Sequence, residues 1–208
     1  MVKLRIPTRS RPPVRTLVVV AHPVDASFIS SLAKAAIESR CKRSGEVRVI
    51  ELYAESFDPL LSEQDWLNKE NRTYTAAVHR DHVEMLRWAT SLVLVYPTWF
   101  GGFPAMLKGW FDRVWAVGVA YEIPENRKRI RRGLTNIREI VVVTTHGSSK
   151  RMNMAQGEPG RQLVRRGLRV LCHPLCRVRW VAFYGNDTAS PQQRVDFRRR
   201  VCDALVAR

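Results

Sequence analysis

Residues Thr16–Ala21 read Thr-Leu-Val-Val-Val-Ala, a continuous run of mostly β-branched residues without polar alternation. Such a run is typical of a β-strand that is covered on both faces. Four later segments also read as strands, and we expect them to lie in the same sheet. They are Glu46–Tyr53, Ser91–Tyr96, Arg138–Thr144 and Arg177–Tyr184.

Segments with helical spacing of apolar residues separate these strands. They are Ser27–Arg43, Ala76–Thr90, Pro104–Val117, Arg161–Leu171 and Pro191–Val206, with Pro104 expected in the first turn of its helix. The segments Ala54–Thr75 and Tyr121–Asn136 show no such pattern and read as irregular. Alternation of buried strands and helices predicts an α/β protein, a doubly wound five-stranded parallel sheet with helices on both faces.

Length and composition are those of one soluble domain. The chain has 208 residues, 45% of them hydrophobic, and no apolar run approaches the roughly 18 residues of a membrane span. Of the four cysteines, only Cys172 and Cys176 are close in sequence, and a lone C-x3-C pair is a poor zinc motif. We therefore expect free thiols, no metal site, no membrane association and a cytoplasmic location.

The first 14 residues form a separate, basic segment that precedes a single domain over residues 15–208. Residues 1–16 contain five Lys or Arg, three Pro and no acidic residue. Because there is no apolar core, this is not a secretory signal. We expect a disordered arm. Its composition also resembles a mitochondrial targeting sequence, although the prolines interrupt the amphipathic helix that such a sequence forms.

The chain is strongly basic, with 35 Lys and Arg against 19 Asp and Glu and a net charge of +16. The basic residues gather locally at Arg127–Arg132, Arg161–Arg169 and Arg198–Arg200, without a nucleic-acid-binding motif or interleaved aromatic residues. We interpret these clusters as solvated faces, some of which attract anionic substrates, and we expect no nucleic-acid partner.

Doubly wound sheets bind ligands at the carboxyl ends of their strands, which directs attention to the loops after Ala21, Tyr96 and Thr144. In the first loop, Ser27 stands at the expected start of a helix, where its hydroxyl and the first helical N–H groups suit a phosphate oxygen. His22 could add a further donor. The alternative is that Ser27 only caps its own helix.

The second loop, Pro97–Phe103, combines aromatic residues with the pair Gly101-Gly102. Glycine lets the backbone approach the edge of a planar heterocycle while aromatic rings flank it. The alternative is an aromatic plug that covers the sheet. The third loop, Thr144–Lys150, offers hydroxyl and N–H groups to the same ligand, although Thr, Ser and Gly are common in any loop.

Two stretches carry a resemblance to a known family. One is His22-Pro23-x3-Ser27-Phe28; the other runs from Tyr96-Pro97-Thr98-Trp99-Phe100-Gly101 into Pro104-Ala105-Met106-Leu107-Lys108-Gly109-Trp110-Phe111-Asp112-Arg113-Val114. From about Arg15 to the C-terminus, the chain resembles the NAD(P)H:quinone oxidoreductase family, and within it the small bacterial-type NAD(P)H dehydrogenases.

The resemblance implies a flavodoxin-like fold with strand order 2-1-3-4-5, a homodimer, and bound FAD, with FMN as the alternative. It assigns three groups of cofactor-binding residues: His22, Ser27 and Phe28 to the flavin phosphates; Pro97, Thr98, Trp99, Phe100 and Gly101 to the isoalloxazine ring; and Thr144, Thr145 and Gly147 to the pyrimidine side of that ring. Trp99, Phe100 and Thr145 would line the ring itself. Lys108, Trp110, Asp112 and Arg113 look structural, and Lys108 and Asp112 are spaced to pair on one helix face.

The implied activity is transfer of a hydride from NAD(P)H through the flavin to a quinone or similar acceptor by a ping-pong mechanism, with no certain catalytic side chain. In the mammalian members a Tyr and a His assist proton movement, and here Met152 and Glu158 occupy the matching positions. Ala26 also replaces a hydroxyl residue beside Ser27. The alternative function is a non-enzymatic electron carrier or a regulatory subunit.

Overall fold

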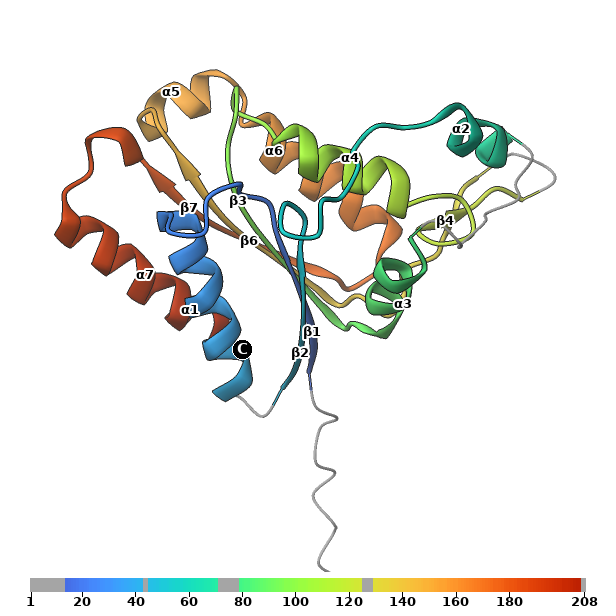
Figure 1. Cartoon of the computed structure of the whole chain (residues 1–208), viewed down its shortest axis with the longest axis horizontal. Coiled ribbons are helices and arrows are strands. Elements are labelled where there is room, and N and C mark those ends of the chain that lie inside the picture. Colours follow the sequence, from blue (N-terminus) through green and yellow to red (C-terminus); the bar gives the residue numbers. More distant parts are fainter. Residues whose placement is uncertain (1–13, 43–44, 71–78, 125–128, 207–208) are drawn as a thin grey trace, which may run out of the picture.

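The computed structural model describes residues 14–42, 45–70, 79–124 and 129–206. Within these ranges, five strands pair in parallel in the order β2-β1-β3-β6-β7 (Figure 1). They are β1 (Arg15–Val20), β2 (Glu46–Glu51), β3 (Ser91–Pro97), β6 (Glu139–His146) and β7 (Arg177–Tyr184). All five expected strands are present, and their order is 2-1-3-4-5 when counted among themselves. The fold prediction is confirmed.

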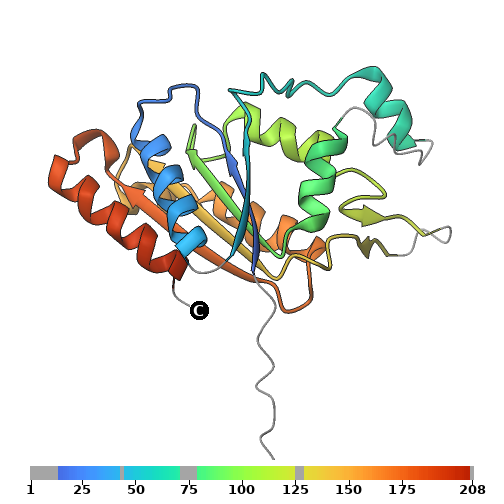
Figure 2. The ribbon, with the colours of Figure 1, turned by 60° about the horizontal axis from the view of Figure 1, so that its bottom comes forward.

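Helices cover both faces of this sheet (Figures 1 and 2). On β1, Leu17 and Val19 pack in the core cluster that contains Trp110 of α4. Val18 and Val20 pack in the cluster that contains Phe197 of α7. Because successive strand residues point to opposite faces, a strand between two helical layers must be apolar at every position, which explains the run at Thr16–Ala21.

The helical layers are unequal. Helices α1 (Phe28–Lys42) and α7 (Pro191–Val206) lie side by side on one face, and α3 (Arg80–Trp88) and α4 (Ala105–Val114) lie on the other. Four short helical pieces connect β6 to β7: α5 (Lys150–Ala155), α6 (Pro159–Gln162), a π-helical segment η1 (Leu163–Leu168) and a 3₁₀ turn η2 (Arg169–Leu171). A second 3₁₀ turn, η3 (Asn186–Thr188), follows β7. No helix among the described residues is long and apolar enough to cross a membrane.

Two regions expected to be irregular contain regular structure. Helix α2 (Glu63–Glu70) begins where the Ser62 hydroxyl accepts from the Asp65 N–H at 3.1 Å and the Asp65 carboxylate accepts from the Ser62 N–H at 3.0 Å. This reciprocal cap resembles a capping box and was a readable signal. Strands β4 (Tyr121–Glu122) and β5 (Arg131–Arg132) form a separate antiparallel ribbon that is too short for its alternation to be detected.

Helix boundaries differ slightly from the expected ones. Pro104 is the N-cap of α4, with an extended ψ of 149°, and is not in the first turn as expected. The ring fixes φ and the residue donates no hydrogen bond, so either position suits proline. The expected helix at Ala76–Thr90 begins at Arg80 in α3, and residues 76–78 lie outside the described ranges. The basic arm over residues 1–13 also lies outside them, so the proposed domain boundary stays a prediction.

Helix α4 is anchored by its own side chains. The expected pair forms, with Lys108 Nζ 2.5 Å from Asp112 Oδ1. Trp110 is fully buried in the core. Arg113 is also buried, and it bridges the Asp58 and Asp65 carboxylates at 3.1 and 3.0 Å. Arg113 therefore ties the segment around Asp58 and the start of α2 to α4.

A second ionic cluster lies at the amino ends of the strands, around Glu139. Its carboxylate is 2.5 Å from the Arg40 guanidinium and 2.6 Å from that of Arg179, and the Ser91 hydroxyl donates to it at 2.9 Å. The Arg40 side chain is only 2% exposed. Burial acts to raise the pKa of Glu139, but the two guanidinium groups outweigh it and hold the pKa below its ordinary 4.5.

Replacing this carboxylate should destabilise the fold, because the buried Arg40 would lose the counter-charge that Glu139 provides. We expect Glu139→Gln to lower the free energy of unfolding by about 3–5 kcal/mol in denaturant titrations. The matched control Asp112→Asn breaks the exposed pair with Lys108 and should cost less than about 1 kcal/mol. Equal losses in the two variants would contradict the assignment.

The same contribution should depend on pH. A carboxyl whose pKa is lowered in the folded state stabilises fully above its unfolded value and loses that effect as pH falls through the folded pKa. The difference in unfolding free energy between the wild type and Glu139→Gln should therefore be constant near neutrality and shrink below pH 4.5.

Candidate functional site

The three loops singled out from the sequence leave neighbouring strands at the same edge of the sheet, the upper edge in Figure 1. Strand β3 lies between β1 and β6. The register pairs Val20 with Val95, and Pro97 with Thr145, so the three strands end at nearly the same level. The reversal of strand order falls between β1 and β3, which is where doubly wound sheets bind their ligands.

The first loop is fixed by local hydrogen bonds. The Ser27 hydroxyl accepts from the Ser30 N–H at 3.1 Å and so caps α1. The His22 Nδ1 accepts from the Val24 N–H at 3.1 Å, and the Ser30 hydroxyl donates to the Val24 carbonyl at 3.0 Å. These bonds hold the N-terminus of α1 at the sheet edge, where first-turn N–H groups have no partner within the helix.

Phe28 fixes the start of α1 through packing contacts with β7 and α7. Its ring meets Phe183 at a centroid distance of 5.8 Å and Phe197 at 6.4 Å, and the Arg194 guanidinium lies 5.3 Å from the Phe28 centroid. The half-buried ring therefore ties α1 to β7 and α7. Its observed contacts are packing contacts that position the loop containing His22 and Ser27.

The second loop makes a tight turn that exposes two aromatic rings. Trp99 and Gly102 exchange backbone hydrogen bonds at 3.3 and 3.0 Å. Between them, Phe100 has a φ of 49° and Gly101 a φ of 72°, as in a type I′ turn. Phe100 is fully exposed and Trp99 is about half exposed. A bulky residue at positive φ is strained, a feature that often marks a functional position.

The second and third loops are joined directly. Both the Thr98 N–H and the Thr98 hydroxyl donate to the Thr145 carbonyl, at 2.9 and 3.0 Å. The side chains of Thr144 and Thr145 are buried, so at this edge the third loop presents mainly backbone and Gly147. A Cβ at Gly147 would collide with the Asp187 carboxylate, so close packing alone already requires glycine there.

A buried histidine lies beneath the third loop. His146 Nδ1 is 2.6 Å from Asn153 Oδ1, while the Asn153 amide nitrogen donates to the Ser148 hydroxyl and the Ser149 carbonyl. This network assigns the proton to Nδ1 and leaves Nε2 as an acceptor. Burial lowers the pKa of His146, which is therefore neutral at pH 7. Its ring stacks on Tyr184 at a centroid distance of 4.6 Å.

Tyr184 links this histidine to a buried carboxylate. The Tyr184 hydroxyl donates to one oxygen of Glu158, and Arg161 pairs with the other at 2.7 Å. Burial acts to raise the pKa of Glu158, but the hydrogen bonds from Tyr184 and Arg161 outweigh it, so the carboxyl is ionised. Burial and the carboxylate together raise the pKa of Tyr184 to about 12.

This cluster sits against the aromatic turn. Glu158 has a φ of 44° and follows Gly157 at 79°, so the chain bends sharply between α5 and α6. Just beyond it, Gly160 lies against the aromatic turn, where an added Cβ would be in ordinary contact with the Gly101 carbonyl at 3.5 Å. The bonds of Glu158 to Tyr184 and Arg161 thus hold the α5–α6 connection against the loop that presents Trp99 and Phe100.

The sequence did not reveal this cluster. The sequence marks Glu158 only as a departure from the mammalian pattern, and it assigns no role to His146 or Tyr184. The position of Tyr184 was a signal that the sequence offered. This residue ends β7, the sheet strand after β6, so it must reach the same edge of the sheet as the third loop. The bend at Glu158 could not be predicted from the sequence, because it depends on a non-glycine residue at positive φ.

A cavity of about 280 Å³ lies on the far side of the first loop. His22, Ser30 and Lys34 line it together with Glu51 and Tyr53 from the end of β2. None of its walls comes from the loops that follow β3 and β6, so it is not the shared pocket expected from the sequence.

Comparison with known proteins agrees with this architecture. The sequence profile of the family described as having a flavodoxin-like fold matches residues 14–205. The chain belongs to this flavodoxin-like family. An NAD(P)H:quinone oxidoreductase from Methanothermobacter marburgensis has the same fold, with a TM-score of 0.80 and 25% identity over 94% of this chain and 98% of that structure.

Two curated relatives of this flavodoxin-like chain are similar over shorter stretches. An uncharacterised NAD(P)H oxidoreductase of Escherichia coli K12 is 38% identical over 122 residues, covering 55% of this chain and 61% of that protein. NAD(P)H dehydrogenase [quinone] 1 of Cavia porcellus is 30% identical over 162 residues, covering 70% of this chain and 58% of that protein. The chain thus spans about three fifths of each relative, and the resemblance to the quinone oxidoreductase family is confirmed.

The bond between Tyr184 and Glu158 can be tested by a double-mutant cycle. We expect Glu158→Gln and Tyr184→Phe each to lower the free energy of unfolding by about 1–3 kcal/mol, because each leaves a partner unsatisfied. The double variant should lose less than the sum by about 1 kcal/mol or more.

Two further measurements accompany the cycle. Tyr184→Phe combined with the distant Asp112→Asn should be additive. An absorbance titration should show the pKa of Tyr184 falling from about 12 in Glu158→Gln, since the carboxylate that raises it is gone, and the same transition should be missing in Tyr184→Phe. Additive losses in the Glu158 and Tyr184 cycle would refute the coupling.

Proposed function

We propose that the protein is a flavin-dependent NAD(P)H:quinone oxidoreductase that holds FAD, or alternatively FMN, at the carboxyl edge of the sheet. The observation that carries the proposal is the Trp99–Gly102 turn. The turn holds Phe100 at a strained, positive φ, and it leaves the Phe100 ring fully exposed and the Trp99 ring half exposed between two polar loops. Water is a poor partner for such rings, whereas a planar heterocycle would cover them.

The remaining residues fit the same ligand. The N-terminus of α1, with Ser27 as its cap and His22 beside it, supplies N–H groups suited to the flavin phosphates. Pro97, Thr98 and Gly101 place backbone beside the ring. Backbone groups near Thr144, Thr145 and Gly147 suit its pyrimidine side. Phe28 supports this arrangement by packing against Phe183.

A bound flavin would supply hydride transfer from NAD(P)H to a quinone, and one open face of the site would serve both substrates in turn, as in a ping-pong reaction. The chain's residues bind the cofactor, orient it and exclude water. Ionised Glu158 already accepts from Tyr184 and pairs with Arg161. We therefore assign it to anchoring the aromatic turn rather than to proton transfer, and Met152 has no proton to offer.

Two further features belong to the proposal. The resemblance described above implies a homodimer, and the exposed side chains of Met152 and Met154 on α5 offer apolar surface for such an assembly. A cytoplasmic location is in keeping with four free cysteines.

The decisive experiment is to identify the cofactor. Purified protein should be yellow, and heat should release a flavin that chromatography identifies as FAD or FMN. The protein should oxidise NADH or NADPH on addition of a quinone, and comparing the two gives the nucleotide preference. Colourless protein that does not bind added flavin would overturn the proposal.

Phe100→Ala tests the carrying observation. The fully exposed ring has few packing contacts to lose, so stability should change by less than about 0.5 kcal/mol. Flavin affinity, measured by calorimetric titration of the flavin-free protein, should fall roughly 5–30-fold, the equivalent of about 1–2 kcal/mol.

Leu175→Ala is the matched control. Leu175 is 77% exposed and lies just before β7, at the amino end of that strand, whereas the proposed flavin site is at the carboxyl ends of the strands. It should leave flavin affinity unchanged. If both variants bind flavin like the wild type, Phe100 does not touch the ligand.

A further inference from the structure

A large groove lies along the free edge of β7, away from the proposed flavin site. Its volume is about 670 Å³, within the range of small-molecule sites. Five of the eight residues that line it are arginines: Arg165, Arg166, Arg169, Arg177 and Arg179. Gln162, Cys176 and Val178 complete the lining, which contains no acidic side chain.

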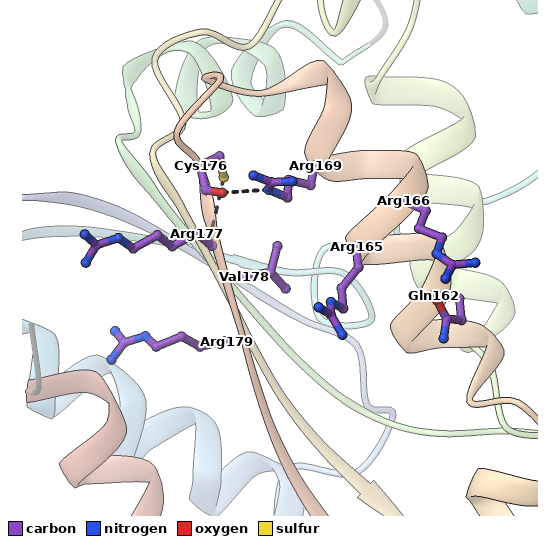
Figure 3. Close-up of a pocket in the computed structure, with 8 residues that line it drawn as sticks. All are labelled: Gln162, Arg165, Arg166, Arg169, Cys176, Arg177, Val178 and Arg179. Carbon is purple, nitrogen blue, oxygen red and sulfur yellow. Dashed lines mark hydrogen bonds between the residues drawn. The ribbon is translucent and has the colours of Figure 1, made fainter.

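The arginines reach the groove from two elements that are separate in the sequence. Figure 3 shows Arg165 and Arg166 on the helical segment on one side of β7, and Arg177 and Arg179 projecting from the strand to the other side. The Arg161–Arg169 cluster seen in the sequence thus lies beside Arg177 and Arg179 in the first half of β7. The groove between them follows the strand edge.

Three of these five guanidinium groups have no counter-charge among the residues that the structure describes. The side chains of Arg165, Arg166 and Arg177 form no hydrogen bond or ion pair with any residue in the described part of the chain. Arg169 donates to the Cys176 carbonyl at 2.7 Å, which carries only a partial charge. Arg179 pairs with Glu139, a carboxylate already shared with Arg40. Like charges gathered without counter-charges repel one another, and a bound anion would relieve that repulsion.

The strand edge adds neutral donors. The Arg177 N–H donates to the Arg138 carbonyl, toward β6, at 3.0 Å. Because neighbouring strand residues direct their backbone groups to opposite sides, the Val178 N–H and carbonyl face the open edge. β7 is the last strand of the sheet on this side, so no described strand takes up these groups.

We propose that this groove is a binding site for an oligophosphate anion. Guanidinium groups match phosphate oxygens as two-pronged donors, and several of them around one groove suit a ligand with closely spaced negative charges. The groove is separate from the flavin edge. Val178 and Tyr184 are six residues apart on β7, about 20 Å at 3.3 Å per residue. The site is thus independent of the proposed activity.

The test is calorimetric titration of the purified full-length protein with inorganic tripolyphosphate in roughly 0.15 M salt. We expect one molecule to bind per chain with a Kd on the order of 10 μM. The variant Arg165→Gln/Arg177→Gln should bind about tenfold more weakly or worse, because it removes one guanidinium from each side of the groove. Arg166→Gln/Arg177→Gln provides a second variant in case the first does not fold.

A matched control has the same change in net charge at a different place. Arg198 and Arg199 are exposed on α7. The variant Arg198→Gln/Arg199→Gln should bind tripolyphosphate within twofold of the wild type. If control and groove variants weaken binding equally, the effect is the general field of a +16 chain and the proposal fails. Absence of binding to the wild type also overturns it.

Two more ligands distinguish the source of the phosphate groups. A nucleoside triphosphate that binds the groove with the same Kd as tripolyphosphate would show that the phosphates alone are recognised, and a tighter Kd would add recognition of the nucleoside. A single-stranded oligonucleotide that binds the groove more tightly than both, with a steep salt dependence, would replace the proposal with a nucleic-acid surface.

Discussion

Parallel pairing of β3 with β1 on one side and β6 on the other is the constraint on which the site depends. Each strand is buried on both faces, and a one-residue slip would exchange the residues that face the two helical layers. The register is therefore held by both core clusters at once. With the register fixed, the three loops end at one edge, and the hydrogen bonds of Thr98 to the Thr145 carbonyl join two of them.

That rigid base supports a strained feature. The Trp99–Gly102 turn holds Phe100 at positive φ, and strain of this kind persists only when the surroundings determine it. On one side the turn rests on Thr98. On the other, the α5–α6 connection packs against Gly101, and Glu158 fastens that connection through Tyr184 and Arg161. Backbone strain, a buried carboxylate and a neutral histidine thus occur together at one end of the sheet, while the ion cluster around Glu139 lies at the opposite end.

The positive charge of the chain is organised by the fold rather than spread evenly. Some arginines are structural: Arg40 and Arg113 are buried and paired with carboxylates. Arg165, Arg166 and Arg177, in the groove at the free edge of β7, have no counter-charge among the described residues. The difference follows from the position of the acidic residues, since no acidic side chain lines the groove and Glu139, which pairs with Arg179, is shared with Arg40.

The sequence by itself determined the sheet and the place of the site. Uninterrupted apolar runs such as Thr16–Ala21 require cover on both faces, and alternation with helices then leaves one topology class and one ligand edge. Only the tertiary structure decided which side chains meet there. The type I′ turn places Phe100 in a disfavoured conformation. The hydrogen bond of Tyr184 to Glu158 brings together residues from separate elements, and so does the groove that Arg165 and Arg177 line. Local propensities do not contain these features, because they arise from packing between segments that are distant in the chain.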